Sequence, residues 1–105
     1  MVREKPRLNI LMSLLALLWL PAFAGGDAAA GKAKAITCAG CHGPEGISTN
    51  PMWPSLAGQR AQYLAKQLRD FRDGKRHNPV MSPMAQGLSD QDIENLAAYY
   101  SGLKP

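Results

Sequence analysis

The segment that most constrains this chain is Cys38-Ala39-Gly40-Cys41-His42. Two thiols three positions apart, followed at once by an imidazole, form the C-x-x-C-H pattern that attaches c-type haem. On a helically turning chain, each thiol reaches one of the two haem vinyl groups and forms a thioether. The histidine then reaches the iron from the proximal side. The segment predicts one covalently bound haem c per chain, with Cys38 and Cys41 as attachment points and His42 as an iron ligand.

Other uses of a C-x-x-C pair explain less of this segment. A disulfide, a redox-active dithiol and half of a zinc site all use two such cysteines. A redox-active dithiol of the thioredoxin type needs alternating strands and helices, and the sequence does not predict such an alternation. A zinc site needs two further ligands, whereas the chain has no other cysteine and only one other histidine, His77. Haem attachment alone accounts for both thiols and the imidazole.

The first 24 residues have the layout of a secretory signal peptide. Basic residues precede an apolar run from Ile10 to Leu20, and Ala22-Phe23-Ala24 supplies an A-x-A cleavage signal. The run is well short of the roughly twenty apolar residues that span a membrane. We expect cleavage after Ala24, location in the periplasm, and a mature domain of residues 25–105 without membrane insertion.

The charge of the chain gives no support to nucleic-acid binding. The whole chain has a net charge of +4, but three basic residues and one acidic residue lie in the predicted leader, so residues 25–105 carry +2. Two haem propionates would bring that value close to zero. The high net charge is the only support for nucleic-acid binding, and most of it lies outside residues 25–105 or is offset by the haem.

The mature chain is predicted to contain three helices and no strand. The first begins after Asp27 as N-cap and runs to about Ile36. Gly31 inside it costs roughly 1 kcal/mol relative to alanine, which indicates that another helix crosses closely there. The second covers residues 60–73, where apolar residues recur at helical spacing and Gly74 follows the end.

The third helix begins at Ser89, where Asp92 completes a pattern like a capping box, and it ends at Gly102. The connections from Gly43 to Gly58 and from Lys75 to Gly87 are rich in glycine and proline, and we expect them to be irregular. The first loop is expected to wrap a haem edge with its apolar side chains Ile47, Trp53 and Leu56.

A haem with one histidine ligand leaves a sixth iron position, and its occupant decides the chemistry. A methionine there closes the iron to other ligands and raises the potential. Met81 and Met84 both lie in the second loop, and spacing alone does not choose between them. His77 is a rival in principle, but its charged and polar neighbours indicate an exposed side chain.

Across the whole mature chain, the sequence resembles class I cytochromes c, and most closely a single haem domain of the cytochrome c4 type. The resemblance rests on four groups of residues, in this order: Cys38-Ala39-Gly40-Cys41-His42-Gly43; Trp53-Pro54-Ser55-Leu56-Ala57-Gly58-Gln59; Tyr63-Leu64-Ala65-Lys66-Gln67-Leu68 with Phe71-Arg72-Asp73-Gly74; and Met81 with Leu88-Ser89-Asp90-Gln91-Asp92-Ile93 and Leu96-Ala97-Ala98-Tyr99-Tyr100.

The resemblance implies an all-α class I cytochrome c fold, with three main helices and loops around one haem, in which Gly31 meets the aromatic pair near Tyr99. It implies that the carbonyl of Pro54 accepts a hydrogen bond from His42. It favours Met81 as the sixth ligand, since the family's ligand lies eight positions before the serine that starts the last helix. Cytochrome c4 has two such domains, whereas this chain has one C-x-x-C-H.

These expectations describe an exported electron carrier rather than an enzyme. One electron would be exchanged with redox proteins, such as membrane respiratory complexes or oxidases, at an exposed haem edge. The alternative is a haem protein with an open sixth site, which would bind ligands or act on peroxide. The two hypotheses differ in whether a methionine binds the iron.

Overall fold

The computed structural model describes residues 2–3 and 25–105, and in this part of the chain the regular elements are all helices. The predicted signal peptide lies outside the described residues, apart from Val2 and Arg3. The all-α prediction is therefore confirmed for residues 25–105. The elements, in chain order, are α2 (Ala28–Lys34), the 3₁₀ helix η1 (Ala35–Thr37), α3 (Ala39–His42), α4 (Ala61–Arg72), α5 (Met81–Gln86) and α6 (Asp90–Ser101).

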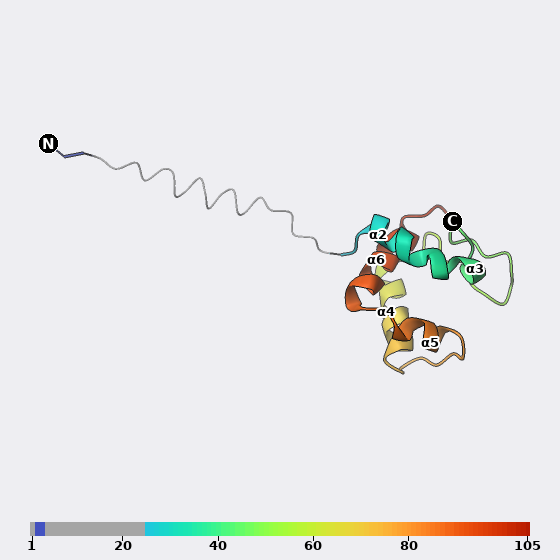
Figure 1. Cartoon of the computed structure of the whole chain (residues 1–105). Helices are drawn as coiled ribbons and strands as arrows, with labels where there is room; N and C mark the ends of the chain where they lie inside the picture. Colours follow the sequence, from blue (N-terminus) through green and yellow to red (C-terminus); the bar gives the residue numbers. More distant parts are fainter. Residues whose placement is uncertain (1, 4–24) are drawn as a thin grey trace.

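Helices α2 and α6 cross at Gly31, and this crossing is the centre of the fold (Figure 1). A Cβ atom on Gly31 would lie 2.0 Å from the backbone oxygen of Asn95 and 2.8 Å from Cβ of Tyr99. Only glycine permits so close an approach. The side chain of Asn95 also accepts a 2.8 Å hydrogen bond from the backbone N–H of Asp27. The predicted close crossing at Gly31 is confirmed.

Helix α4 completes the core by packing its apolar face against α6. Ile93 and Leu96 of α6 are almost fully buried, and burying a side chain of that size contributes about 2 kcal/mol. Asp73 is the C-cap of α4, and Gly74 follows with φ of +80°, as the sequence predicts. The buried core cluster consists of Ala35, Leu64, Ala65, Ile93, Leu96, Ala97 and Tyr100.

Side-chain caps fix where the first and last main helices begin. Asp27 Oδ1 accepts hydrogen bonds from the backbone N–H groups of Ala29 and Ala30, which confirms the predicted N-cap. At α6, Ser89 Oγ accepts from the Asp92 N–H and Asp92 Oδ2 accepts from the Ser89 N–H, each at 3.0 Å. The predicted capping box is therefore present, and each bond satisfies a backbone N–H that the helix itself leaves without a partner.

The expectation that residues 75–87 are wholly irregular is wrong, because Met81–Gln86 form α5. Pro83 discouraged a helix in the sequence, but it falls in the first turn of α5. There its missing N–H would have had no helical partner, so proline is tolerated. The first helix is also shorter than expected, since regular α-helix ends at Lys34 and η1 continues the chain.

We predict that Gly31→Ala lowers the free energy of unfolding by roughly 1–3 kcal/mol, because overpacking forces α2 and α6 apart. Urea unfolding of the haem-loaded protein, followed by circular dichroism, measures the change. Gly87→Ala is the matched control, since no atom lies within 4 Å of its added Cβ and its φ is −84°. Equal midpoints for the two variants would contradict the close crossing.

We predict that Asp92 makes the domain more stable at neutral than at acid pH. The backbone N–H of Ser89 lowers the pKa of Asp92 below its ordinary value of 3.8. The capping interaction is therefore fully present above that value and is lost as the pH falls through the lower folded-state pKa. The free energy of unfolding of Asp92→Asn should accordingly fall less between pH 6 and pH 3 than that of the wild type. An equal fall in both proteins would show that Asp92 makes no such contribution.

Candidate haem site

The C-x-x-C-H segment forms one helical turn, and it follows directly after α2 and η1, of which α2 crosses α6. The backbone N–H of Cys38 donates to the carbonyl of Ala35 at 2.8 Å, which joins η1 to the motif. The carbonyl of Cys38 then accepts from the N–H of His42 at 3.0 Å. Cys38 packs against the core cluster, and both cysteines are half-buried. The motif is therefore carried by the core and not by a detached loop.

His42 is buried and makes one specific polar contact. Its side chain leaves 8% of its surface exposed, and Nδ1 lies 2.7 Å from the carbonyl oxygen of Pro54. Because a carbonyl can only accept, Nδ1 carries the proton and Nε2 has the lone pair that a metal ligand needs. This is the contact that the family resemblance implies, and it fixes both the tautomer and the ring orientation.

A turn at Gly43 brings Pro54 back to His42. Gly43 has φ of +89°, and a Cβ there would lie 2.0 Å from the backbone oxygen of Ile47. The loop that follows is closed by hydrogen bonds from the N–H groups of Leu56 and Ala57 to the carbonyl of Gly46, at 2.7 and 3.0 Å. The loop after the motif is thus ordered by its backbone, which explains how a residue twelve positions away faces the imidazole.

The segment around Met81 is ordered by Asn78, a residue that the sequence analysis did not select. Asn78 Oδ1 accepts from the backbone N–H groups of Val80 and Met81, at 2.9 and 3.0 Å. The N–H of Asn78 in turn donates to Oγ of Ser82, which is buried. The dipeptide Asn78-Pro79 was the available signal, because it favours the start of a turn.

The three candidate sixth ligands differ in exposure. Met81 is half-buried at the start of α5, whereas Met84 leaves 43% of its surface exposed and His77 is exposed. In Figure 1, α3 and α5 lie on the same side of α4 and α6 in the view. The choice between Met81 and Met84 as the sixth ligand stays a prediction.

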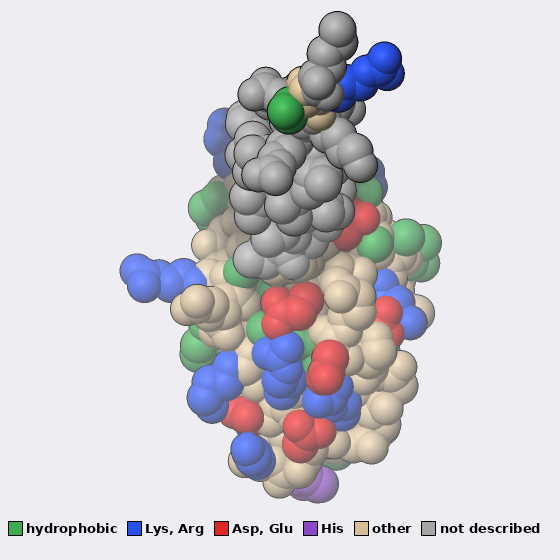
Figure 2. All heavy atoms as spheres, turned by 90° about the vertical axis from the view of Figure 1, so that its left-hand side faces the viewer, with side chains coloured by type: hydrophobic (Ala, Val, Ile, Leu, Met, Phe, Trp, Pro, Cys, Tyr) green, Lys and Arg blue, Asp and Glu red, His purple; other side chains and the backbone are tan. Residues whose placement is uncertain are grey.

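The phenol of Tyr100 lies beside Cys38 of the motif. Burial raises the pKa of this phenol above its ordinary value of 10. Figure 2 shows basic and acidic side chains interspersed on one face of the molecule. A groove of about 970 Å³ is lined by Gly25, Gly26 and charged residues of α4 and α6, and none of the motif residues lines it.

The residues present fit a haem. Two thiols at helical spacing, an imidazole with Nε2 as its ligating atom and a half-buried thioether form a donor set suited to a c-type haem iron. The loops beside the motif and around α5 also expose large apolar side chains, as expected where a polypeptide surrounds a large apolar ring. These exposed side chains are Ile47, Met52, Trp53, Val80 and Met84.

This combination of helices and motif defines a c-type cytochrome domain. Residues 28–104 match the Cytochrome c family, and the chain belongs to that family. The family and the Cys38, Cys41 and His42 motif together give the chain one covalently bound haem c.

Within the family, the chain is similar to cytochrome c4. Cytochrome c4 of Pseudomonas aeruginosa is 50% identical over 98 residues, which cover 91% of this chain and 49% of that protein. Cytochrome c-554(548) of Halomonas halodenitrificans is 52% identical over 79 residues, which cover 72% of this chain and 95% of that protein. The chain therefore spans about half the length of that cytochrome c4 relative and nearly all of cytochrome c-554(548).

A solved structure confirms the fold class. The crystal structure of reduced recombinant cytochrome c4 from Pseudomonas stutzeri superposes with a TM-score of 0.67 at 36% identity. The match covers 82% of this chain and 55% of that chain. The expected class I cytochrome c fold and the resemblance to one domain of cytochrome c4 are both confirmed.

We predict that Asn78→Ala loosens the start of α5. Loss of two hydrogen bonds from backbone N–H groups to the Asn78 side chain is worth about 1 kcal/mol, so amide exchange at residues 80–82 and 84–86 should quicken roughly fivefold. Asn50→Ala is the matched control, because Asn50 Oδ1 accepts from the N–H of Met52 in the other loop. Unchanged exchange in α5 of Asn78→Ala would show that Asn78 does not order this segment.

Proposed function

We propose that the chain is a monohaem electron carrier with histidine and methionine as axial ligands. The observation that carries the proposal is the buried His42, whose Nδ1 donates to the Pro54 carbonyl and whose Nε2 remains to bind iron. Haem supplies reversible one-electron chemistry between ferrous and ferric iron. The protein's part is to bind the group, to orient the ligands and to keep water from the iron.

Each proposed role follows from a position in the fold. Cys38 and Cys41 hold the group covalently from one helical turn, so it cannot dissociate when the iron changes charge. His42 supplies the proximal imidazole in an orientation fixed by Pro54. Met81 supplies the sixth ligand, because the resemblance to cytochrome c4 favours this methionine, and its backbone N–H is bound by Asn78. Met84, the runner-up, is more exposed and takes a place beside the pocket.

The proposal also includes where the chain is located and with which proteins it exchanges electrons. Residues 1–24 direct export and are removed after Ala24, which leaves residues 25–105 as a periplasmic domain. No helix in the part of the chain that the structure describes has the length and apolar character to cross a membrane.

The electron donor and acceptor are redox proteins, with membrane respiratory complexes and oxidases as the partner class. No proton donor or nucleophile is assigned a role, so the chain is not proposed to be an enzyme.

We predict that Met81→Ala removes the methionine-to-iron charge-transfer band from the optical spectrum of the ferric protein and lowers its reduction potential. A thioether ligand favours the ferrous state, so its loss favours the ferric state. Met84→Ala is the control and should keep the band.

Each other outcome has a definite meaning. A band that persists in Met81→Ala and vanishes in Met84→Ala would move the ligand to Met84. Absence of the band from the wild-type protein would contradict the electron-carrier proposal and favour an open sixth site. Binding of carbon monoxide to the ferrous wild-type protein would point the same way.

A further inference from the structure

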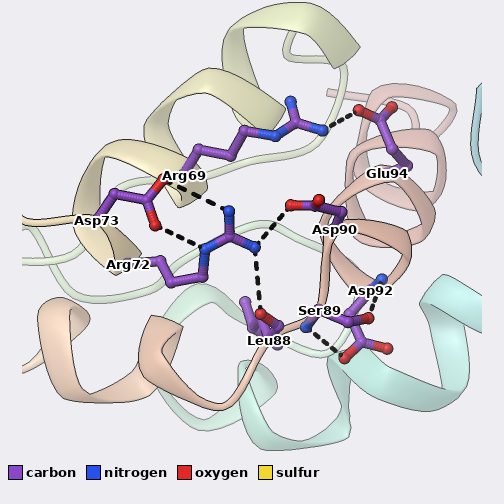
Figure 3. A network of polar contacts seen from close by, with 8 residues as sticks. All are labelled: Arg69, Arg72, Asp73, Leu88, Ser89, Asp90, Asp92 and Glu94. Atoms are coloured by element: carbon purple, nitrogen blue, oxygen red, sulfur yellow. Dashed lines mark hydrogen bonds and ion pairs between the residues drawn. The ribbon is translucent and has the colours of Figure 1, made fainter.

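The segment that carries Met81, residues 77–88, is attached at its far end by the side chain of Arg72 (Figure 3). Arg72 is the last residue of α4. Its Nη1 donates to the backbone carbonyl of Leu88 at 3.4 Å and to Oδ1 of Asp90 at 2.8 Å, while Nε donates to Oδ1 of Asp73 at 2.9 Å. One guanidinium thus joins α4 to the residue that ends the segment and to the first residue of α6.

The backbone of Arg72 holds the same end. Nε2 of Gln86, the last residue of α5, donates to the carbonyl of Arg72 at 2.7 Å. The end of α5 and the start of α6 are therefore both fastened to one residue of α4. Only 21% of the Arg72 side chain is exposed, whereas its partners Asp73 and Asp90 are 49% and 76% exposed.

A second arginine secures the near end of the segment. The guanidinium of Arg76 stacks on Phe71, with Cζ 4.5 Å from the ring centroid, and Nη1 donates to Oε1 of Gln67 at 2.8 Å. The carbonyl of Arg76 accepts from Oγ of Ser82 at 3.5 Å. Arg76 therefore binds α4 with its side chain and α5 with its backbone.

Within the polypeptide, few side chains of α5 are buried, and Leu88 at the end of the segment packs against the core cluster. The helix has six residues, of which only Ser82 and Ala85 are buried. A helix so short does not persist by itself, and burial of one alanine methyl is a weak anchor. The position of Met81 then depends on how the two ends of its segment are attached.

We propose that Arg72 and Arg76 are positioning residues for Met81: as a two-arginine clamp, they hold both ends of residues 77–88 against α4 and so keep the sixth ligand in place. This proposal rests on the methionine ligation proposed above. Arg72 touches neither the ligand nor the C-x-x-C-H motif among the described contacts. Its effect on the iron is exerted through the segment.

The charges of the clamp persist over a wide pH range. The hydrogen bond from Arg72 lowers the pKa of Asp73, and Asp73 and Asp90 together raise the pKa of Arg72 further above its ordinary value. Exposed ion pairs nevertheless add little to the stability of a whole domain. The clamp should therefore affect local opening of residues 77–88 far more than global unfolding. Such a segment opens locally at a much lower free energy than the whole domain needs to unfold.

The test uses haem-loaded Arg72→Gln and Arg76→Gln. Urea titrations follow the methionine-to-iron charge-transfer band of the ferric protein and, in the same samples, helix content by circular dichroism. In each variant, the band should disappear at lower urea than the helix signal. The equilibrium constant for loss of the band in water should rise roughly three- to tenfold, as expected for one ordinary hydrogen bond whose partners are largely exposed.

Arg69→Gln is the matched control. Arg69 also joins α4 to α6, through an ion pair with Glu94, but it has no hydrogen bond to residues 77–88 among the described contacts. In this variant, the band and the helix signal should be lost together. Arg72→Lys supplies a second test, because an ammonium keeps the charge but lacks the fork that spans Leu88, Asp73 and Asp90. It should show an intermediate shift.

The outcomes distinguish this proposal from the proposed function. If the wild-type protein has the band, and band and helix are lost together in Arg72→Gln and Arg76→Gln, the clamp is overturned and methionine ligation stands. An equal early loss of the band in Arg69→Gln also overturns the clamp, because any link between α4 and α6 would then suffice. A wild-type protein without the band overturns methionine ligation, and the clamp proposal with it.

Discussion

The close approach of α2 and α6 at Gly31 is the constraint on which the rest of the domain depends. Because the Asn95 carbonyl and the Tyr99 side chain occupy the space beside Gly31, the two helices pack backbone against backbone. Helix η1 and the C-x-x-C-H turn continue directly from α2, so their position follows from this crossing. The other end of α6 lies beside Arg72, at the end of the segment that carries Met81. Helix α6 therefore helps to position both the C-x-x-C-H motif and the segment that carries Met81.

The features that the sequence predicted are those with local signals. The N-cap Asp27, the capping box at Ser89 and the terminating Gly74 depend on residues within a few positions of each other, and all three are present. Gly31 was informative because an unexplained glycine in a helix requires a close neighbour. Helix α5 was missed because Pro83 is a helix breaker in most positions and is tolerated only in the first turn.

The contacts of Arg72 and Asn78 could not be predicted from the pattern. Arg72 lies on the polar side of an amphipathic helix, where arginines are usually solvated, and its partners are 16 and 18 residues away. Whether such a side chain binds Leu88 and Asp90 or water depends on the path of the intervening chain. Asn78 signalled a turn, but nothing in the sequence indicated that its side chain would bind the N–H of the candidate ligand.

The partner of His42 is a main-chain carbonyl, and this has a consequence for how the site can vary. A side-chain acceptor disappears when its residue is replaced, whereas every residue at position 54 would still present a carbonyl. The orientation of the imidazole is therefore encoded in the course of the loop rather than in the identity of one amino acid. Substitutions at position 54 that preserve that course leave the acceptor in place, so a scan of side chains would pass over one of the most important contacts in the domain.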